Sequence, residues 1–276
     1  DGSGFIFRAY YALPPLSNKD GIPVGAVIGF CNMLIKLIEE KKTDKLIVVF
    51  DTARKTFRNE IYKSYKANRG DPPEDLIPQF DLIRKAVDAF DVTRVELPGY
   101  EADDLIATYS KFFVSKNWKV SIISSDKDLM QLVNKDVNMI DPLKNKIIEE
   151  EQVIEKFGVP PNKVIDVQSL AGDSIDNIPG APGIGIKTAA LLINDYGNLE
   201  NLINNFNSIK QTKRREAIQN NINEIKISKR LVTLKDDIAI KIDIDKISGN
   251  NFNEKKLLVF LEKYGFNNLK NRLSKK

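Results

Sequence analysis

The chain has 276 residues, with 42% hydrophobic residues, 29% charged residues and a net charge of +4. These values are typical of a globular protein of one or two domains and exclude the disordered and collagen-like classes. One cysteine and no histidine exclude intrachain disulfides, cysteine-rich zinc sites and catalysis by Ser-His-Asp or Cys-His groups. No run is long and apolar enough for a membrane helix, and the first ten residues lack a signal-peptide pattern, which predicts a cytoplasmic protein.

The first 150 residues alternate short apolar runs with helical patterns, which predicts an α/β fold with a mostly parallel central sheet covered by helices. After about residue 160 the strand signal fades and a helical second domain is expected. Within it, 173–190 is expected to be a turn that leads into a helix, and 209–234 a pair of polar helices. In chain order we expect helices over 24–38, 76–90 and 102–116, and strands over 46–50, 92–97 and 120–123.

Acidic residues follow the expected strands or begin the helix over 102–116. Because ligands of an open α/β sheet bind at the carboxyl ends of its strands, these acids are expected at one edge. One acid at a helix start is more often a cap than a ligand. Several acids gathered at one edge repel one another and favour a cation, and with no histidine an all-oxygen site selects Mg²⁺ or Mn²⁺. The acids are Asp1 in the turn-like DGSG, Asp51, Glu101, Asp103, Asp104, Asp126 and Asp128.

The segment DSIDNIPGAPGIGIKTA, residues 173–189, is rich in glycine and proline and enters a helix. Its spacing fits neither a Walker A loop nor a dinucleotide fingerprint. A helix-hairpin-helix, in which Gly183 and Gly185 let backbone amides approach a phosphate and Lys187 adds charge, and an ordinary glycine turn remain open alternatives. Asp173 and Asp176 would add acids from the second domain.

The segment 54–69 is strongly basic and contains interleaved aromatic residues, with Glu60 its one acid. Such a segment suits a nucleic-acid strand, through phosphate charge and base stacking. A second basic cluster at Lys210, Lys213, Arg214 and Arg215 could hold duplex phosphates, although a solvated helix face explains it equally well.

The chain resembles the 5′ nuclease domain of bacterial DNA polymerase I and the wider flap endonuclease family in long ordered motifs. These are DGSGFIFRAYYALPPL, VVFD, FRNEIYKSYKANR, PGYEADDLIAT, SSDKDLMQL and LAGDSIDNIPGAPGIGIKTA. The resemblance implies a PIN-like nuclease core with a helical arch over 1–160 and a helix-three-turn-helix domain over 161–276. It also implies a β-strand ahead of Asp1. A stand-alone exonuclease and a domain of a polymerase remain alternatives.

The resemblance further implies a monomeric, two-metal hydrolase that cuts DNA at 5′ flaps, nicks and ends, RNA primers included. A monovalent cation such as K⁺ is expected at the hairpin 183–187. Catalytic contacts to the scissile phosphate are expected from Lys66 and Arg69. The metal ligands implied are Asp1, Asp51, Glu101, Asp103, Asp104, Asp126, Asp128, Asp173 and Asp176. The DNA contacts expected are Phe7, Arg8, Arg54, Arg58, Lys63, Tyr65, Gly183, Gly185, Lys187, Thr188, Lys213, Arg214 and Arg215.

Two other functions are considered. A PIN-type ribonuclease would have the same acidic sheet edge, but such enzymes are usually shorter and lack the hairpin after Gly180. A catalytically inactive relative would bind junctions without cutting, and the retention of all the implied acids disfavours it.

Overall fold

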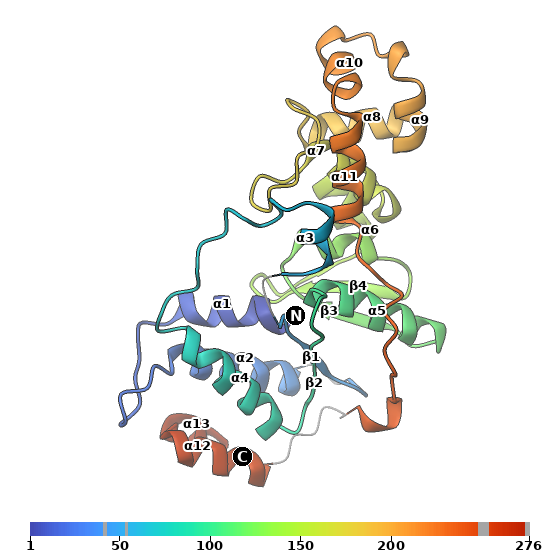
Figure 1. Cartoon of the computed structure of the whole chain (residues 1–276). Helices are drawn as coiled ribbons and strands as arrows, with labels where there is room; N and C mark the ends of the chain where they lie inside the picture. The colour runs from blue at the N-terminus through green and yellow to red at the C-terminus, as the bar shows by residue number, and fades with distance from the viewer. Residues whose placement is uncertain (41–42, 53–54, 248–253, 274–276) are drawn as a thin grey trace. The chain divides into compact units, whose positions relative to one another are not determined.

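A computed structural model describes residues 1–40, 43–52, 55–247 and 254–273, and its course is drawn in Figure 1. The chain divides into two compact units, each assembled from separated segments. Unit 1 contains residues 1–52, 71–97 and 239–276, and unit 2 contains residues 53–70 and 98–238. The described residues after 238, which were expected in the second domain, belong to unit 1 together with the N-terminal helices.

Unit 1 has a parallel pair of strands and helices that pack on one another. Strand β1 (Ile47–Val49) pairs with β2 (Thr93–Val95), Ile47 lying opposite Thr93. Helix α1 packs on α2, and both α2 and α12 contact α4. The helices are α1 (Gly2–Ala12), α2 (Gly25–Glu40), α4 (Ile77–Ala89), α12 (Glu254–Tyr264) and α13 (Asn267–Leu273), with a 3-10 turn at Ile244–Lys246.

The start of α1 is packed closely against the end of β1. A Cβ added at Gly2 would lie 2.5 Å from the ring of Phe50, so only glycine allows this approach. Asp1 is the N-cap of the helix, and its carboxylate accepts a hydrogen bond of 2.9 Å from the Gly4 amide. The turn-like DGSG is therefore the first turn of a helix, because the capping aspartate satisfies an amide that a turn would leave to water.

The core of unit 1 includes the chain's one cysteine. Cys31 lies on α2 and is fully buried. Burial in this apolar surrounding raises the pKa of its thiol to about 12. Cys31 is therefore a residue of the core.

Unit 2 begins with a short helix and a small mixed sheet and continues as helices. Strand β3 (Val120–Ile123) pairs in parallel with β4 (Val137–Asp141), and β4 pairs in antiparallel with β5 (Lys146–Ile148). The helices are α3 (Phe57–Ile61), α5 (Ala102–Ser115), α6 (Glu150–Phe157), α7 (Val164–Ala171), α8 (Ile186–Tyr196), α9 (Leu199–Asn204), α10 (Thr212–Gln219) and α11 (Ile222–Val232), with 3-10 turns at Lys127–Leu132, Pro161–Lys163 and Phe206–Ser208.

The expected helices and strands of the first 150 residues are present with ends shifted by a few residues. The sheet differs from the expected single one: the described strands form a pair and a separate group of three. Paired helices over 209–234 are confirmed as α10 and α11. Among the described residues, no helix has the length and apolar character needed to cross a membrane.

Candidate active site

The expected acids are distributed over both units, and each unit is described by itself. In unit 1, Asp51 lies two residues after the end of β1, and its amide donates a 2.9 Å hydrogen bond to the Ser3 hydroxyl on α1. Arg84 on α4 donates to the Asp51 carbonyl at 2.8 Å. Asp1 and Asp51 therefore belong to one local arrangement, built where β1 ends and α1 begins.

In unit 2, three acids begin helix α5. Glu101 is the N-cap residue and is 8% exposed, whereas Asp104 is completely buried. The carboxylate of Asp104 accepts the Glu101 amide at 3.1 Å, which fixes the first turn of the helix. Asp103, the third acid, is partly exposed.

The segment after α3 brings basic and aromatic side chains to Glu101. The ammonium of Lys66 lies 2.9 Å from Glu101 Oε2, and the Tyr65 hydroxyl donates to the same oxygen at 3.2 Å. Burial by itself would lower the pKa of Lys66, but the negative charges of Glu101 and Asp176 outweigh it and raise that pKa. Lys66 is therefore held as a cation beside two of the expected metal ligands.

Hydrogen bonds join the loop 173–178 to the segment 64–69. Lys66 and Arg69 are therefore held beside the acids of the loop. The Lys66 amide donates to the Asp176 carbonyl at 2.9 Å. The side-chain amides of Asn68 and Asn177 donate to the Ser174 and Ser64 carbonyls at 2.9 and 3.0 Å. Lys66 adopts a left-handed φ of 56°, which is uncommon for a residue with a Cβ. These bonds hold that conformation in place.

Two further basic side chains neutralise the acids of this loop. Arg69 donates to Asp176 Oδ1 from Nη2 at 2.5 Å and from Nε at 2.9 Å. Lys127 forms an ion pair with Asp173. Burial would raise the pKa of Asp173, but the hydrogen bond and charge of Lys127, together with backbone hydrogen bonds from Ile175 and Asp176, outweigh it and lower that pKa.

Asp126 and Asp128 stand at the start of the 3-10 turn that follows β3. Asp126 caps this turn by accepting the Asp128 amide at 2.9 Å. Burial and the neighbouring charge of Asp126 raise the pKa of Asp128 to about 6, and Gln168 donates to its carboxylate at 2.6 Å. Two carboxylates that disfavour each other's charge in this way suit a cation between them.

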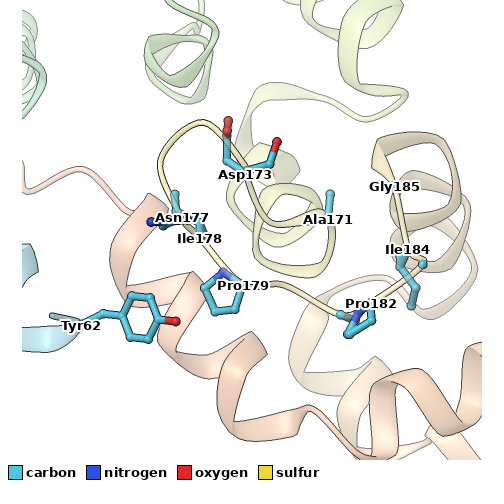
Figure 2. A pocket seen from close by; sticks show the side chains of 12 residues that line it. Tyr62, Ala171, Asp173, Asn177, Ile178, Pro179, Pro182, Ile184 and Gly185 are labelled. Atoms are coloured by element: carbon cyan, nitrogen blue, oxygen red, sulfur yellow. The ribbon is translucent and has the colours of Figure 1, made fainter. Parts of the chain in front are cut away.

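The hairpin 180–187 lies beside an open cavity of about 590 Å³, shown in Figure 2. Residues of the loop from Ala171 to Gly185 line the cavity, together with Tyr62. Gly180 has a φ of +59°, and a Cβ there would lie 2.4 Å from the Gly172 amide nitrogen. Gly183, Gly185 and Lys187 are exposed at the start of α8, where the helix leaves its first amides unpaired.

The expected DNA contacts differ in how they are exposed. Phe7, 42% exposed, packs edge-on against Phe80 in unit 1. In unit 2 Lys63 and Lys213 are exposed, whereas Thr188, Arg214 and Arg215 are partly exposed, as is Arg8 in unit 1. Arg54 lies outside the described residues.

Two of the expected DNA contacts lie in the interior of unit 2. Arg58 is 1% exposed and Tyr65 is 5% exposed. Arg58 donates both ends of its guanidinium to Asp104, and Tyr65 packs with Ile178 and Leu231. Neither side chain presents a surface to DNA, because acidic and apolar partners distant in the sequence enclose it.

The described residues contain no group of three or more His, Cys, Asp or Glu side chains in an arrangement that would hold a metal ion. In unit 2, Glu101, Asp173 and Asp176 instead form ion pairs with basic side chains. Sequence reasoning did not assign roles to Lys127 or Gln168. Lys127 lies between the expected ligands Asp126 and Asp128 in the sequence, which could have indicated a place in the site. Nothing in the sequence distinguishes Gln168.

Two family models match the chain. One, described as "5′-3′ exonuclease, N-terminal resolvase-like domain", matches residues 1–158, and the other, "5′-3′ exonuclease, C-terminal SAM fold", matches residues 159–255. A DNA polymerase I of Rhizobium leguminosarum is 51% identical over 99% of this chain, which spans 28% of that relative's length. A 5′-3′ exonuclease of Aquifex aeolicus is 40% identical, with 88% of this chain and 82% of that protein covered.

Solved structures share the fold. The bacteriophage T5 D15 flap endonuclease, in a complex with DNA and metal ions, has a TM-score of 0.72 and 22% identity, covering 85% of this chain and 88% of that one. The catalytic core of Rad2 in complex with a DNA substrate has a TM-score of 0.61 and 17% identity, covering 96% of this chain and 85% of that one. These likenesses confirm an α/β nuclease fold with a helical C-terminal region.

Proposed function

The chain belongs to the 5′-3′ exonuclease family, whose reaction is the hydrolysis of phosphodiester bonds in DNA, and we propose how its residues divide that work. The proposed substrates are 5′ flaps, nicks and ends, RNA primers included. The observation that carries the proposal is the junction in unit 2 where Lys66 and Arg69 meet Glu101 and Asp176. It places cationic groups for a phosphate beside oxygen ligands for metal ions.

We propose a PIN-like nuclease core with a helical arch over 1–160 and a helix-three-turn-helix domain over 161–276, acting as a monomer. The family models divide the chain close to the same position, at 158 and 159. Packing in the structure adds that residues 239–276 contribute to the unit that contains α1 and α2. A covalently attached polymerase domain is compatible with the relatives named above.

We propose that the site binds two hard divalent ions such as Mg²⁺ or Mn²⁺. All donors are carboxylates, and burial together with the neighbouring charge of Asp126 raises the pKa of Asp128, whose charged form a cation would favour. When bound, the ions would supply charge stabilisation at the phosphate and a more acidic water. The ligands we propose are Asp1 and Asp51 in unit 1, and Glu101, Asp103, Asp126, Asp128, Asp173 and Asp176 in unit 2. Asp104, the other expected ligand, is enclosed by hydrogen bonds.

Lys66 and Arg69 bind and orient the scissile phosphate in this proposal. Both form ion pairs with carboxylates in the structure. The side chain of Lys66 is 21% exposed and that of Arg69 is 51% exposed. Divalent ions on Glu101 and Asp176 would compete for the carboxylate oxygens and leave the ammonium and guanidinium free to pair with phosphate oxygens. The Lys66 ammonium and the Arg69 guanidinium would then stabilise the negative charge that develops on the phosphate as the phosphodiester bond breaks.

The hairpin at the start of α8 binds the duplex in this proposal, at a distance along the chain from the cutting site. Gly183, Gly185 and Lys187 would form a phosphate site at a helix N-terminus, and a monovalent cation such as K⁺ would add positive charge at this hairpin. Lys213, Arg214 and Arg215 on α10 would contact phosphates further along the duplex.

The direct test is cleavage of a 5′-labelled flap duplex, with Mg²⁺ and then with EDTA. We expect products cut at or near the flap junction only when Mg²⁺ is present. A single-stranded RNA substrate in the same assay tests the ribonuclease alternative. Tight flap binding without cleavage in Mg²⁺ would instead identify a junction-binding protein and overturn the proposed hydrolase.

A further inference from the structure

A buried ion pair in unit 2 links segments that carry the proposed site. The two terminal nitrogens of Arg58, on α3, each lie 2.7 Å from a different oxygen of Asp104 on α5. Arg58 Nε donates to the Leu231 carbonyl at 2.7 Å, and Nη2 donates to the Thr233 carbonyl at 3.2 Å. The guanidinium thus joins α3, the first turn of α5 and the end of α11.

The oxygens of Asp104 are fully used by protein donors. Oδ1 accepts Arg58 Nη2 and the Lys235 amide at 2.9 Å, and Oδ2 accepts Arg58 Nη1 and the Glu101 amide at 3.1 Å. An ionised carboxylate has about four acceptor positions, so none remains for a metal ion. Asp104 is also completely buried.

Through these bonds the pair controls the position of Glu101. Asp104 holds the Glu101 backbone, and Arg58 Nη1 lies 3.7 Å from Glu101 Oε2, the oxygen that also contacts Lys66. Arg58 lies on the helix that precedes Lys66, so one guanidinium fixes both sides of the contact between Lys66 and Glu101. A shift of Arg58 would move both groups.

We propose that Arg58 and Asp104 are positioning residues for the hydrolysis, and that neither contacts DNA or metal. They hold Glu101 and Lys66 at the spacing that the site requires, as partners behind metal ligands do in other metal sites. The inference rests on the proposed role of Glu101 as a ligand. It reassigns Arg58 from the expected DNA contacts and Asp104 from the expected ligands.

The test compares Arg58→Lys and Asp104→Asn with the parent chain. Arg58→Lys keeps the charge but loses the two-pronged contact, and Asp104→Asn keeps an acceptor oxygen. Arg272→Lys is the control, since Arg272 is also ion-paired, with Glu39, at a place with no proposed role. Each protein is assayed for kcat and KM on one 5′ flap in Mg²⁺, for Mn²⁺ affinity without DNA by calorimetry, and for its melting temperature.

We expect Arg58→Lys to lower kcat and weaken Mn²⁺ binding by about tenfold each, with KM changed by less than about twofold. Asp104→Asn should do the same, and the double variant should be no worse than either single one because both act through the same ion pair. Arg272→Lys should match the parent in kcat and in Mn²⁺ affinity.

Several results would overturn the inference. If Arg58→Lys kept the parental kcat and Mn²⁺ affinity, the ion pair would only stabilise the fold. If the variant raised KM alone, Arg58 would contact DNA, as first expected. Additive losses in the double variant would show separate roles. If either variant fails to fold, the other carries the same test. A parent chain that neither binds Mn²⁺ nor cuts the flap would overturn the proposed function itself.

Discussion

Two basic regions of unit 2 look alike in sequence and differ in structure. In the segment 55–69, Arg58, Lys66 and Arg69 each pair with a carboxylate of the same unit. On α10, Lys213 is exposed, and Arg215 donates to the Ile209 carbonyl rather than to an acid. The first region therefore balances charge inside the protein, whereas the second offers charge to the solvent.

The difference shows that a run of positive residues does not by itself mark a nucleic-acid surface. The acids that accompany such a run can lie far away in the sequence, as Glu101 and Asp176 do here. Within the segment 55–69, burial separates Arg58, which lies in the interior, from Lys66 and Arg69, whose side chains are partly exposed. We therefore expect variants in the first region to change the rate of cutting and variants in the second to change binding.

The largest effect is expected from removing the acids of the loop. Replacing Asp173 and Asp176 together by asparagine should slow cutting in Mg²⁺ by about 10³-fold or more, because two proposed ligands lose their charge. Binding measured in Ca²⁺ should be as tight as before or tighter, since less negative charge faces the phosphates. Asp136→Asn, at a partly exposed aspartate beside Lys135, is the control. A double variant that cuts at the parental rate would show that these acids only pair with Lys127 and Arg69.

A smaller effect is expected from the basic residues, and it separates the two regions directly. Lys66→Ala should lower the single-turnover rate by about 10²-fold with little change in affinity, because its ammonium stabilises charge in the transition state. Lys187→Ala should weaken flap binding by about tenfold and leave the single-turnover rate at saturation nearly unchanged. Equal reductions of both parameters in both variants would contradict this division.

Replacing the two hairpin glycines by alanine should change the free energy of unfolding by different amounts. Gly180→Ala is expected to lower the free energy of unfolding by about 2 kcal/mol or more, because its φ is positive and the added Cβ would meet backbone atoms. Gly185→Ala should be near neutral, since the space beside its Cα is open. Urea unfolding of both variants checks this contrast. Equal stability of the two would mean that the loop relaxes around residue 180.

The smallest effect concerns the salt dependence of binding. Replacing Lys213 or Arg214 by glutamine should reduce the slope of log affinity against log salt by about 0.9 for each phosphate that the variant no longer neutralises. Lys135→Gln, at an exposed lysine of unit 2, should leave the slope unchanged. The comparison needs a salt titration on a single flap duplex. An unchanged slope in both α10 variants would leave α10 as a plain solvated helix.

Local patterns in the sequence predicted the helices and strands well. The candidate site depends on contacts between residues distant in the sequence, which such patterns do not predict. The helices α2 and α5 and strand β3 lie nearly where periodicity placed them, because their buried faces repeat at helical or strand spacing. The proximity of Lys66 to Glu101 was not visible, nor was the enclosure of Arg58 by Asp104 and Leu231. Those contacts join residues that only the folded chain brings together, so no local pattern records them.

The single cysteine gives this chain a practical property. Since the Cys31 thiol is fully buried and its pKa is raised to about 12, it is expected to resist maleimide and disulfide reagents in the folded protein. A cysteine introduced at an exposed site such as Leu143, 66% exposed in the turn between β4 and β5, would then be the one reactive thiol. A fluorescent dye could be attached there without first removing the native residue, and flap binding could be followed by the dye's polarisation.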